Sequence, residues 1–221
     1  MDKTEMNSHA QNPERLTLDA AAVGWAAYDA KDYPAALAFF APYKDDPIGQ
    51  YFIGAIYLDD KSLQHKRLEG LELLKRSADA GTYFAWLALG RYYAEEGENQ
   101  DLRQAIIWYD KGAEYGCSGC QVNLGWCYCR LEEFTLASKW LFISAVLGAE
   151  QGQHLFNLLF VKATSEQYEK GCQRGMEWLE AKRVVDESQF HHELRNWLSL
   201  DRESSLNMER DLSRIRTEPS L

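Results

Sequence analysis

Proline is nearly absent from most of this chain. Four of the five prolines lie in the first quarter (Pro13, Pro34, Pro42 and Pro47), and none occurs from residue 48 to residue 218. Proline interrupts a helix because it lacks an amide hydrogen and its ring clashes with the preceding turn. Its absence leaves a very long stretch in which helix is permitted.

Long apolar runs are also missing. No run approaches the roughly 20 residues that span a bilayer, and the polar first 13 residues lack the apolar core of a signal peptide. We therefore expect a cytoplasmic protein. The five cysteines are odd in number and irregularly spaced, which is typical of reduced thiols rather than of a disulfide framework.

Positive charge is scarce. The chain carries 24 Lys and Arg against 34 Asp and Glu, a net charge of −10. This balance disfavours nucleic acid, whose phosphates bind to cationic surfaces, and an anionic membrane surface. An acidic surface suits a basic protein partner, but it also suits solubility alone.

What the sequence does contain is a repeat. Three segments place an aliphatic residue, a glycine and then a tyrosine on one helical face. They are Ile53-Gly54 with Tyr57, Leu89-Gly90 with Tyr93, and Leu124-Gly125 with Tyr128, at spacings of 36 and 35 residues. Because glycine inside a helix costs about 1 kcal/mol relative to alanine, its recurrence predicts a neighbouring helix that passes too close for a β-carbon.

A second series runs in phase with the first. A large residue recurs with a small residue three positions before it, a pattern that predicts a second helix nested against the first. The large residues are Leu73, Trp108, Trp140 and Trp178, preceded by Gly70, Ala105, Ala137 and Gly175. Glycines at 81, 116 and 148 follow three of these segments, and glycine is the usual left-handed stop of a helix.

These residues carry a resemblance to known repeat families. The segment from Trp86 to Tyr93 matches the Trp-x2-Leu-Gly-x2-Tyr core of the tetratricopeptide type. The end of the second helix more closely resembles the Sel-one-like repeat. Eight positions fall on its frame, with cysteine in place of alanine at 120: Ala105, Trp108, Lys111, Ala113, Gly116, Cys120, Leu124 and Gly125. At position 112, Gly112 also stands in place of an alanine of the pattern.

The resemblance covers about residues 18–183 and implies an all-α, right-handed α/α solenoid of about five helix pairs. The pairs fall near 17–46, 47–81, 82–116, 117–148 and 149–185. The terminal pairs depart from the frame, as end repeats often do. We expect a flexible leader over 1–15, the solenoid over 16–200 with a capping helix near 187–200, and a tail or terminal helix over 201–221.

The resemblance also implies a binding face, since the first helices of such pairs line the concave side. Counting from the repeat frame gives the residues expected in the groove: Tyr51, Asp59, Arg91, Glu95, Trp126, Arg130, His154 and Lys162. Tyrosine, tryptophan and arginine are enriched at binding hot spots. The alternative is that Tyr51 and Trp126 pack against the next first helix, and that Arg91 pairs with Glu95 four residues on.

Four thiols invite two other interpretations. Cys117-x2-Cys120 followed by Cys127-x-Cys129 has the short spacing of zinc ligands. However, residues two apart on a helix point about 200° apart, so Cys127 and Cys129 cannot both face one ion. The Cys117–Cys120 pair has redox spacing, but such motifs normally follow a strand, so we do not expect a redox role.

No catalytic arrangement is evident. His191 and His192 are adjacent and diverge on a helix, whereas a metal pair needs offsets of three or four. We expect no enzymatic activity, no metal and no cofactor. The leading hypothesis is a module that binds a protein partner in its groove. The alternatives are an immunity protein that neutralises a secreted toxin or effector, as some bacterial Sel-one-like proteins do, and a thiol-metal regulatory protein.

Overall fold

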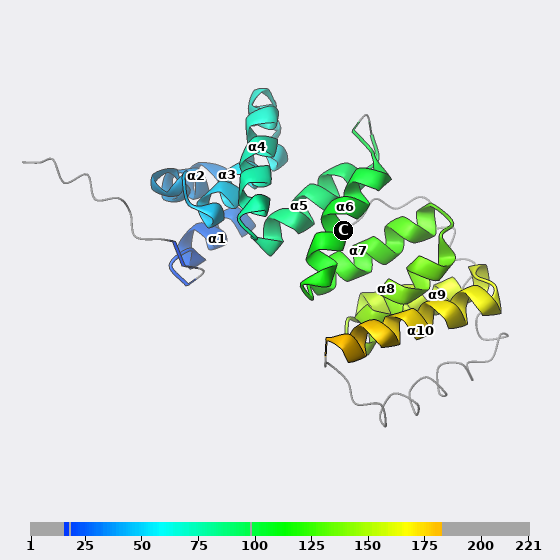
Figure 1. Cartoon of the computed structure of the whole chain (residues 1–221). Helices are drawn as coiled ribbons and strands as arrows, with labels where there is room; N and C mark the ends of the chain where they lie inside the picture. Colours follow the sequence, from blue (N-terminus) through cyan, green and yellow to red (C-terminus); the bar gives the residue numbers. More distant parts are fainter. Residues whose placement is uncertain (1–15, 18, 98, 183–221) are drawn as a thin grey trace, which may run out of the picture. The chain divides into compact units, whose positions relative to one another are not determined.

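The computed structural model describes residues 16–182, with Leu18 and Glu98 excepted. Within this part of the chain all regular structure is helical: ten α-helices and two short 3₁₀ segments, without a strand (Figure 1). The all-α prediction is confirmed for these residues. The expected leader, the capping helix near 187–200 and the tail lie outside the described residues.

The helices follow one another as closely spaced pairs. The first two pairs are α1 (Ala22–Asp29) with α2 (Tyr33–Phe40), and α3 (Pro47–Asp59) with α4 (Arg67–Asp79). The 3₁₀ segments η1 (Ala41–Tyr43) and η2 (Lys61–Lys66) precede α3 and α4. The later pairs are α5 (Tyr83–Ala94) with α6 (Leu102–Glu114), α7 (Ser118–Arg130) with α8 (Phe134–Val146), and α9 (Glu150–Lys162) with α10 (Ser165–Ala181). Among the described residues no helix has the length and apolarity needed to cross a membrane.

Side chains at the helix starts explain several of these boundaries. The carboxylates of Asp32, Asp46 and Asp101 accept hydrogen bonds from the first free amides of α2, α3 and α6. Such caps satisfy amides that have no partner within the helix. Thr164 and Gln167 form a reciprocal capping box at the start of α10.

The predicted glycine stops are confirmed. Gly81, Gly116 and Gly148 have φ values of 87°, 85° and 84°. In each case the amide of the following residue donates to a carbonyl five residues back, as from Thr82 to Ser77, which is the Schellman arrangement. Lys31 and Glu132 adopt the same left-handed conformation, with φ of 59° and 60°, although neither is glycine.

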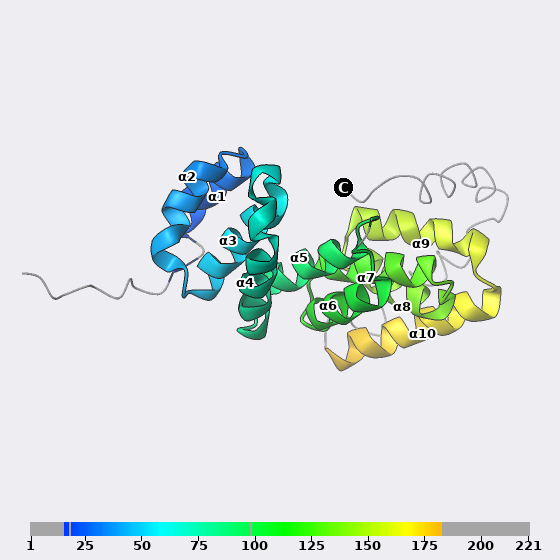
Figure 2. The same ribbon diagram turned by 90° about the horizontal axis from the view of Figure 1, so that it is seen from above.

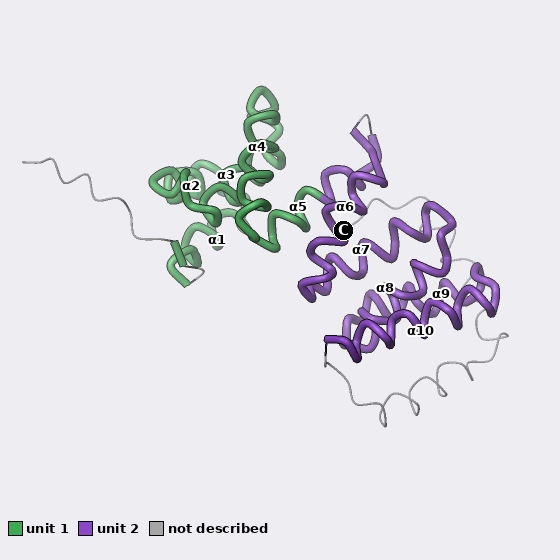
Figure 3. Tube along the Cα trace, in the orientation of Figure 1, with its two compact units in different colours: residues 1–89 green, residues 90–221 purple. Residues whose placement is uncertain are grey.

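The chain divides into two compact units, residues 1–89 and 90–221, which are described separately (Figure 3). In the first unit, Phe40 of α2 and Phe52 of α3 are both fully buried and stack at 4.2 Å between ring centroids. The glycines of α3 and α4 face each other. A β-carbon on Gly54 would lie 2.8 Å from the carbonyl oxygen of Gly70, which confirms the predicted close approach.

In the second unit, α8 contacts α7, α9 and α10 (Figure 2). Eight of its 13 residues are buried, as expected of a helix that is apolar on all sides. Gly90 lies against the ring of Tyr109, and a β-carbon on Gly125 would lie 2.6 Å from Leu141 Cγ. Gly175 was expected to lie against the first helix of its own pair, and this prediction was wrong. Gly175 packs on Phe142 of α8 rather than on α9, the first helix of its own pair.

Candidate functional site

Partly exposed aromatic rings from three first helices meet in the first unit. Phe84 of α5 lies edge-on to Trp25 of α1, with centroids 5.3 Å apart, and its ring stacks on Tyr51 of α3 at 5.5 Å. Tyr83 adjoins Phe84 at 3.9 Å. We call Trp25, Tyr51, Tyr83 and Phe84 the aromatic cluster. Trp25 and Tyr83 remain 40% and 43% exposed, so the cluster presents apolar ring surface to solvent.

An acidic group adjoins this cluster. The hydroxyl of Tyr28 donates to Asp59 Oδ2 at 2.6 Å, and the rings of Tyr28 and Trp25 both lie edge-on to Phe52. Burial, and then the hydrogen bond to Asp59, raise the pKa of Tyr28. The phenol therefore stays protonated and donating. Asp59 itself is exposed, so an acidic side chain stands beside the rings.

The sequence identified part of this cluster. Of the residues expected in the groove, Tyr51 belongs to the cluster and Asp59 adjoins it through Tyr28. Tyr51 also packs on Phe84 of the next first helix, which is the contact that the alternative interpretation proposed. The frame missed Trp25 because the first pair has shifted spacing. Tyr83, Leu87 and Arg91 are spaced four residues apart and so lie along one side of α5. Counting two further turns back from Arg91 would have identified Tyr83.

The second unit contains another predicted aromatic residue. Trp126 of α7 is half-buried, and the guanidinium of Arg130 lies over its ring at 5.1 Å. Arg130 also pairs with Glu96, with 3.4 Å between Nη1 and Oε1. Arg130 therefore already contacts both Trp126 and Glu96. Its substitution would remove these internal contacts as well as a side chain expected in the groove.

The remaining predicted residues lie on the surface. Arg91, Glu95, His154 and Lys162 are all exposed. Among the described residues, no ion pair joins Arg91 to Glu95, although they are one helical turn apart. Within the described part of the chain, no hydrogen bond or ion pair joins these four side chains to one another, so they define a polar surface rather than a site.

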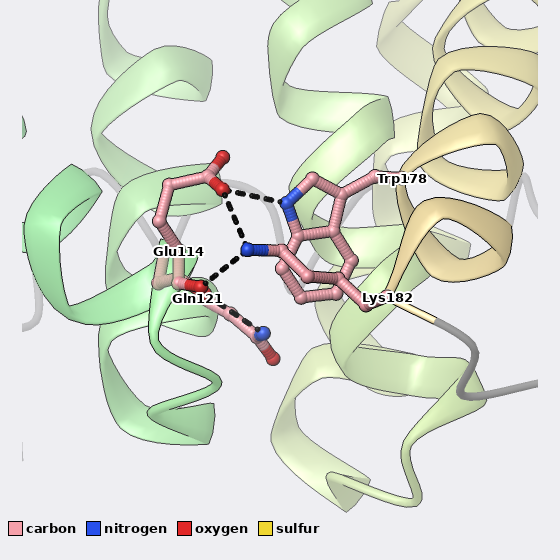
Figure 4. A network of polar contacts seen from close by, with 5 residues as sticks. Glu114, Gln121, Trp178 and Lys182 are labelled. Atoms are coloured by element: carbon pink, nitrogen blue, oxygen red, sulfur yellow. Dashed lines mark hydrogen bonds and ion pairs between the residues drawn. The ribbon is translucent and has the colours of Figure 1, made fainter.

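A polar network joins the ends of two second helices in the second unit (Figure 4). Glu114 of α6 accepts a hydrogen bond from Trp178 Nε1 of α10 at 2.9 Å, and its carboxylate lies 3.5 Å from Lys182 Nζ. Lys182 also donates to the Glu114 carbonyl, and Gln121 donates to that of Ala113. The contacts of Glu114 with Trp178 and Lys182 join α6 to the end of α10. The side-chain oxygen of Gln121 is buried without a hydrogen-bond partner.

The cysteines do not assemble around one point. Within the described ranges, no three His, Cys, Asp or Glu side chains are placed to hold a metal ion. Cys127 and Cys172 are buried, and burial raises the pKa of each to about 12. Cys117 and Cys120 do lie together at the start of α7, where the Cys120 amide donates to Cys117 Sγ at 3.4 Å.

A cavity of about 450 Å³ opens in the first unit between α2, η1, α3 and α4. Leu37, Ile53 and Leu73 form its apolar part. Its rim carries two cations, Lys44 and Arg76, and two carboxylates of Asp45 and Glu69. This balance of charges gives it no clear preference for an anionic or a cationic ligand.

Comparison of the chain with family models, with curated proteins and with solved structures finds no match. A function for the chain is therefore inferred from its own sequence and geometry.

Proposed function

We propose that this chain is a Sel-one-like, right-handed α/α solenoid without enzymatic activity, and that it binds a protein partner on the face of its first helices. The aromatic cluster is the observation that carries the proposal. Exposed tryptophan and tyrosine supply large contact area at low entropic cost. Here they come from α1, α3 and α5, the first helices of three consecutive pairs.

Charge points to the kind of partner. The chain has a net charge of −10, and Asp59 stands beside the aromatic rings. Arginine and lysine are attracted both to carboxylates and to aromatic faces. The partner that fits is a basic protein whose exposed segment places arginine or lysine between aliphatic residues.

The test compares two cluster variants with a matched control. Trp25→Ala and Tyr83→Ala remove exposed rings from the cluster, whereas Leu68→Ala removes a 79% exposed side chain from α4 in the same unit. Partners are captured by cross-linking in cells, identified by mass spectrometry, purified and titrated by calorimetry. Each cluster variant should weaken binding by about tenfold or more, and the control should bind as the unmodified chain does.

Unchanged affinity in both cluster variants, with the fold intact by circular dichroism, would contradict the proposal. Trp25→Phe serves as a second variant if Trp25→Ala fails to fold. One stoichiometric basic partner would identify a neutralising role, and several partners would identify an adaptor.

A further inference from the structure

One cysteine, Cys120, departs from the repeat frame together with a glycine, Gly112, and a second cysteine, Cys117, lies three residues before it. Cys120 of α7 is fully buried. Cys120 and Gly112 of α6 each stand where the Sel-one-like pattern has an alanine. The structure gives a steric reason for the pairing. A β-carbon on Gly112 would collide with Cys120 Sγ and lie 3.7 Å from the β-carbon of Cys117. Gly112 thus leaves the space that the Cys120 thiol occupies.

The two thiols differ in environment. Cys117 is half-buried at the N-cap of α7, directly after the exposed turn residues Tyr115 and Gly116. Its φ and ψ of −67° and 106° are extended rather than helical, which turns its sulfur toward the Cys120 amide 3.4 Å away. Cys117 is therefore partly accessible to reagents, whereas Cys120 is fully buried.

Hydrogen bonds to its sulfur favour the thiolate form of Cys117. Hydrogen bonding from the Cys120 thiol, and secondarily from the amides of Cys120 and Gly119, lowers the pKa of Cys117 to about 7 against an opposing effect of burial. The same thiol contact, together with burial, raises the pKa of Cys120. One cysteine is thus prepared to attack while the other retains its proton.

We propose that Cys117 and Cys120 form a redox-active dithiol that exchanges with small-molecule disulfides. The Cys117 thiolate attacks one sulfur of the disulfide, forming a mixed disulfide and releasing one thiolate. Cys120 then loses its proton to water and attacks Cys117 Sγ, releasing the second thiolate. Two protein thiols are oxidised to one intrachain disulfide, and one disulfide is reduced to two thiols. This site is independent of the aromatic cluster, which lies in the other unit.

The first experiment uses glutathione disulfide with the full chain at pH 7.5, followed by peptide mapping. The unmodified chain should form the Cys117–Cys120 disulfide. Cys120→Ser should hold glutathione on Cys117, because the resolving thiol is gone. Cys117→Ser should not react, and serine at this N-cap should preserve the helix. Cys172→Ser, which removes a buried thiol on α10, should behave as the unmodified chain.

A chain that remains reduced, or that takes up glutathione equally at its other cysteines, would overturn the proposal. The second experiment follows alkylation of Cys117 by iodoacetamide against pH. The rate should be half-maximal near pH 7, the value to which the pKa of Cys117 is lowered. At pH 7 it should be about threefold that of an ordinary thiol, since a larger thiolate fraction is partly offset by lower nucleophilicity.

The Cys120 side chain can be tested as a positioning group in the same assay. Cys120→Ala removes the hydrogen-bond donor and should move the midpoint toward the ordinary thiol value, whereas Cys120→Ser keeps a donor and should move it less. A midpoint near 8.5 in the unmodified chain, or an identical midpoint in all three proteins, would refute the assignment.

Discussion

Single residues decide where the helices of this chain stop. Gly81, Gly116 and Gly148 were recognisable in the sequence because glycine alone enters the left-handed region without strain. Lys31 and Glu132 take that conformation too, but nothing in their residue type marks them. The sequence therefore predicts the stops that use glycine and misses those in which the surrounding turn overrides the preference of a longer side chain.

Exchange of residue types at these stops should change stability in opposite directions. Glu132→Gly should stabilise the chain by about 0.5–1 kcal/mol, since the relief of strain exceeds the added entropy of the unfolded state. Gly116→Ala should destabilise it by about 1 kcal/mol. A β-carbon there meets nothing within 4 Å, so that loss arises from the backbone alone. Urea denaturation measures both, and equal signs would contradict the explanation.

Residue type also limited the prediction of the site. Tyr51 and Asp59 were found because they lie at fixed offsets from Gly54. Trp25 was missed because Gly24 and its neighbours keep a different spacing. The contact that matters, Trp25 on Phe84, joins residues 59 positions apart, and no offset within one repeat encodes it.

At the scale of helices, glycine sets how closely partners approach. The recurring Gly54, Gly90 and Gly125 predicted such contacts, and each lies against the second helix of its own pair. The partner of Gly175 was predicted wrongly, because a small residue shows that a neighbouring helix is close without showing which helix it is. In α10 that neighbour is α8.

Gly54→Ala tests the α3–α4 contact. Alanine favours helix by about 1 kcal/mol, but its β-carbon would meet the Gly70 carbonyl, which cannot move without moving α4. We expect a net loss of about 1–2 kcal/mol in urea denaturation. Gly70→Ala should cost a similar amount, and the double variant less than the sum because both act on one contact. Strict additivity would show that the glycines do not share it.

The Glu114 network tests the attachment of α10. Trp178→Phe keeps an aromatic ring near Trp140 but removes the donor to Glu114, and should cost about 1 kcal/mol. Lys182→Met should cost less than about 0.5 kcal/mol, because its ion pair is solvent-exposed. Thermal unfolding of the two variants beside the unmodified chain gives this order. A larger effect of Lys182→Met would indicate that charge, rather than the indole hydrogen bond, holds the helix.

At the scale of the whole molecule, the chain forms two compact units. Because most contacts of a helix lie within its own unit, damage should remain local. Gly54→Ala should accelerate amide hydrogen exchange in α3 and α4, and Trp178→Phe in α8 and α10, while the other unit keeps its protection. Acceleration spread evenly over residues 16–182 by either variant would show that the two units unfold as one.

The paired glycines of α3 and α4 have one further consequence. The Gly70 carbonyl oxygen lies 2.8 Å from the position that a β-carbon of Gly54 would take, so the two backbones meet without side chains between them. Neither glycine has a side chain whose rotamers must be frozen when the helices meet, so this crossing escapes the side-chain entropy that other packed residues lose. The same crossing cannot adjust by rotamer exchange, and α3 and α4 should respond to load as a stiff hairpin.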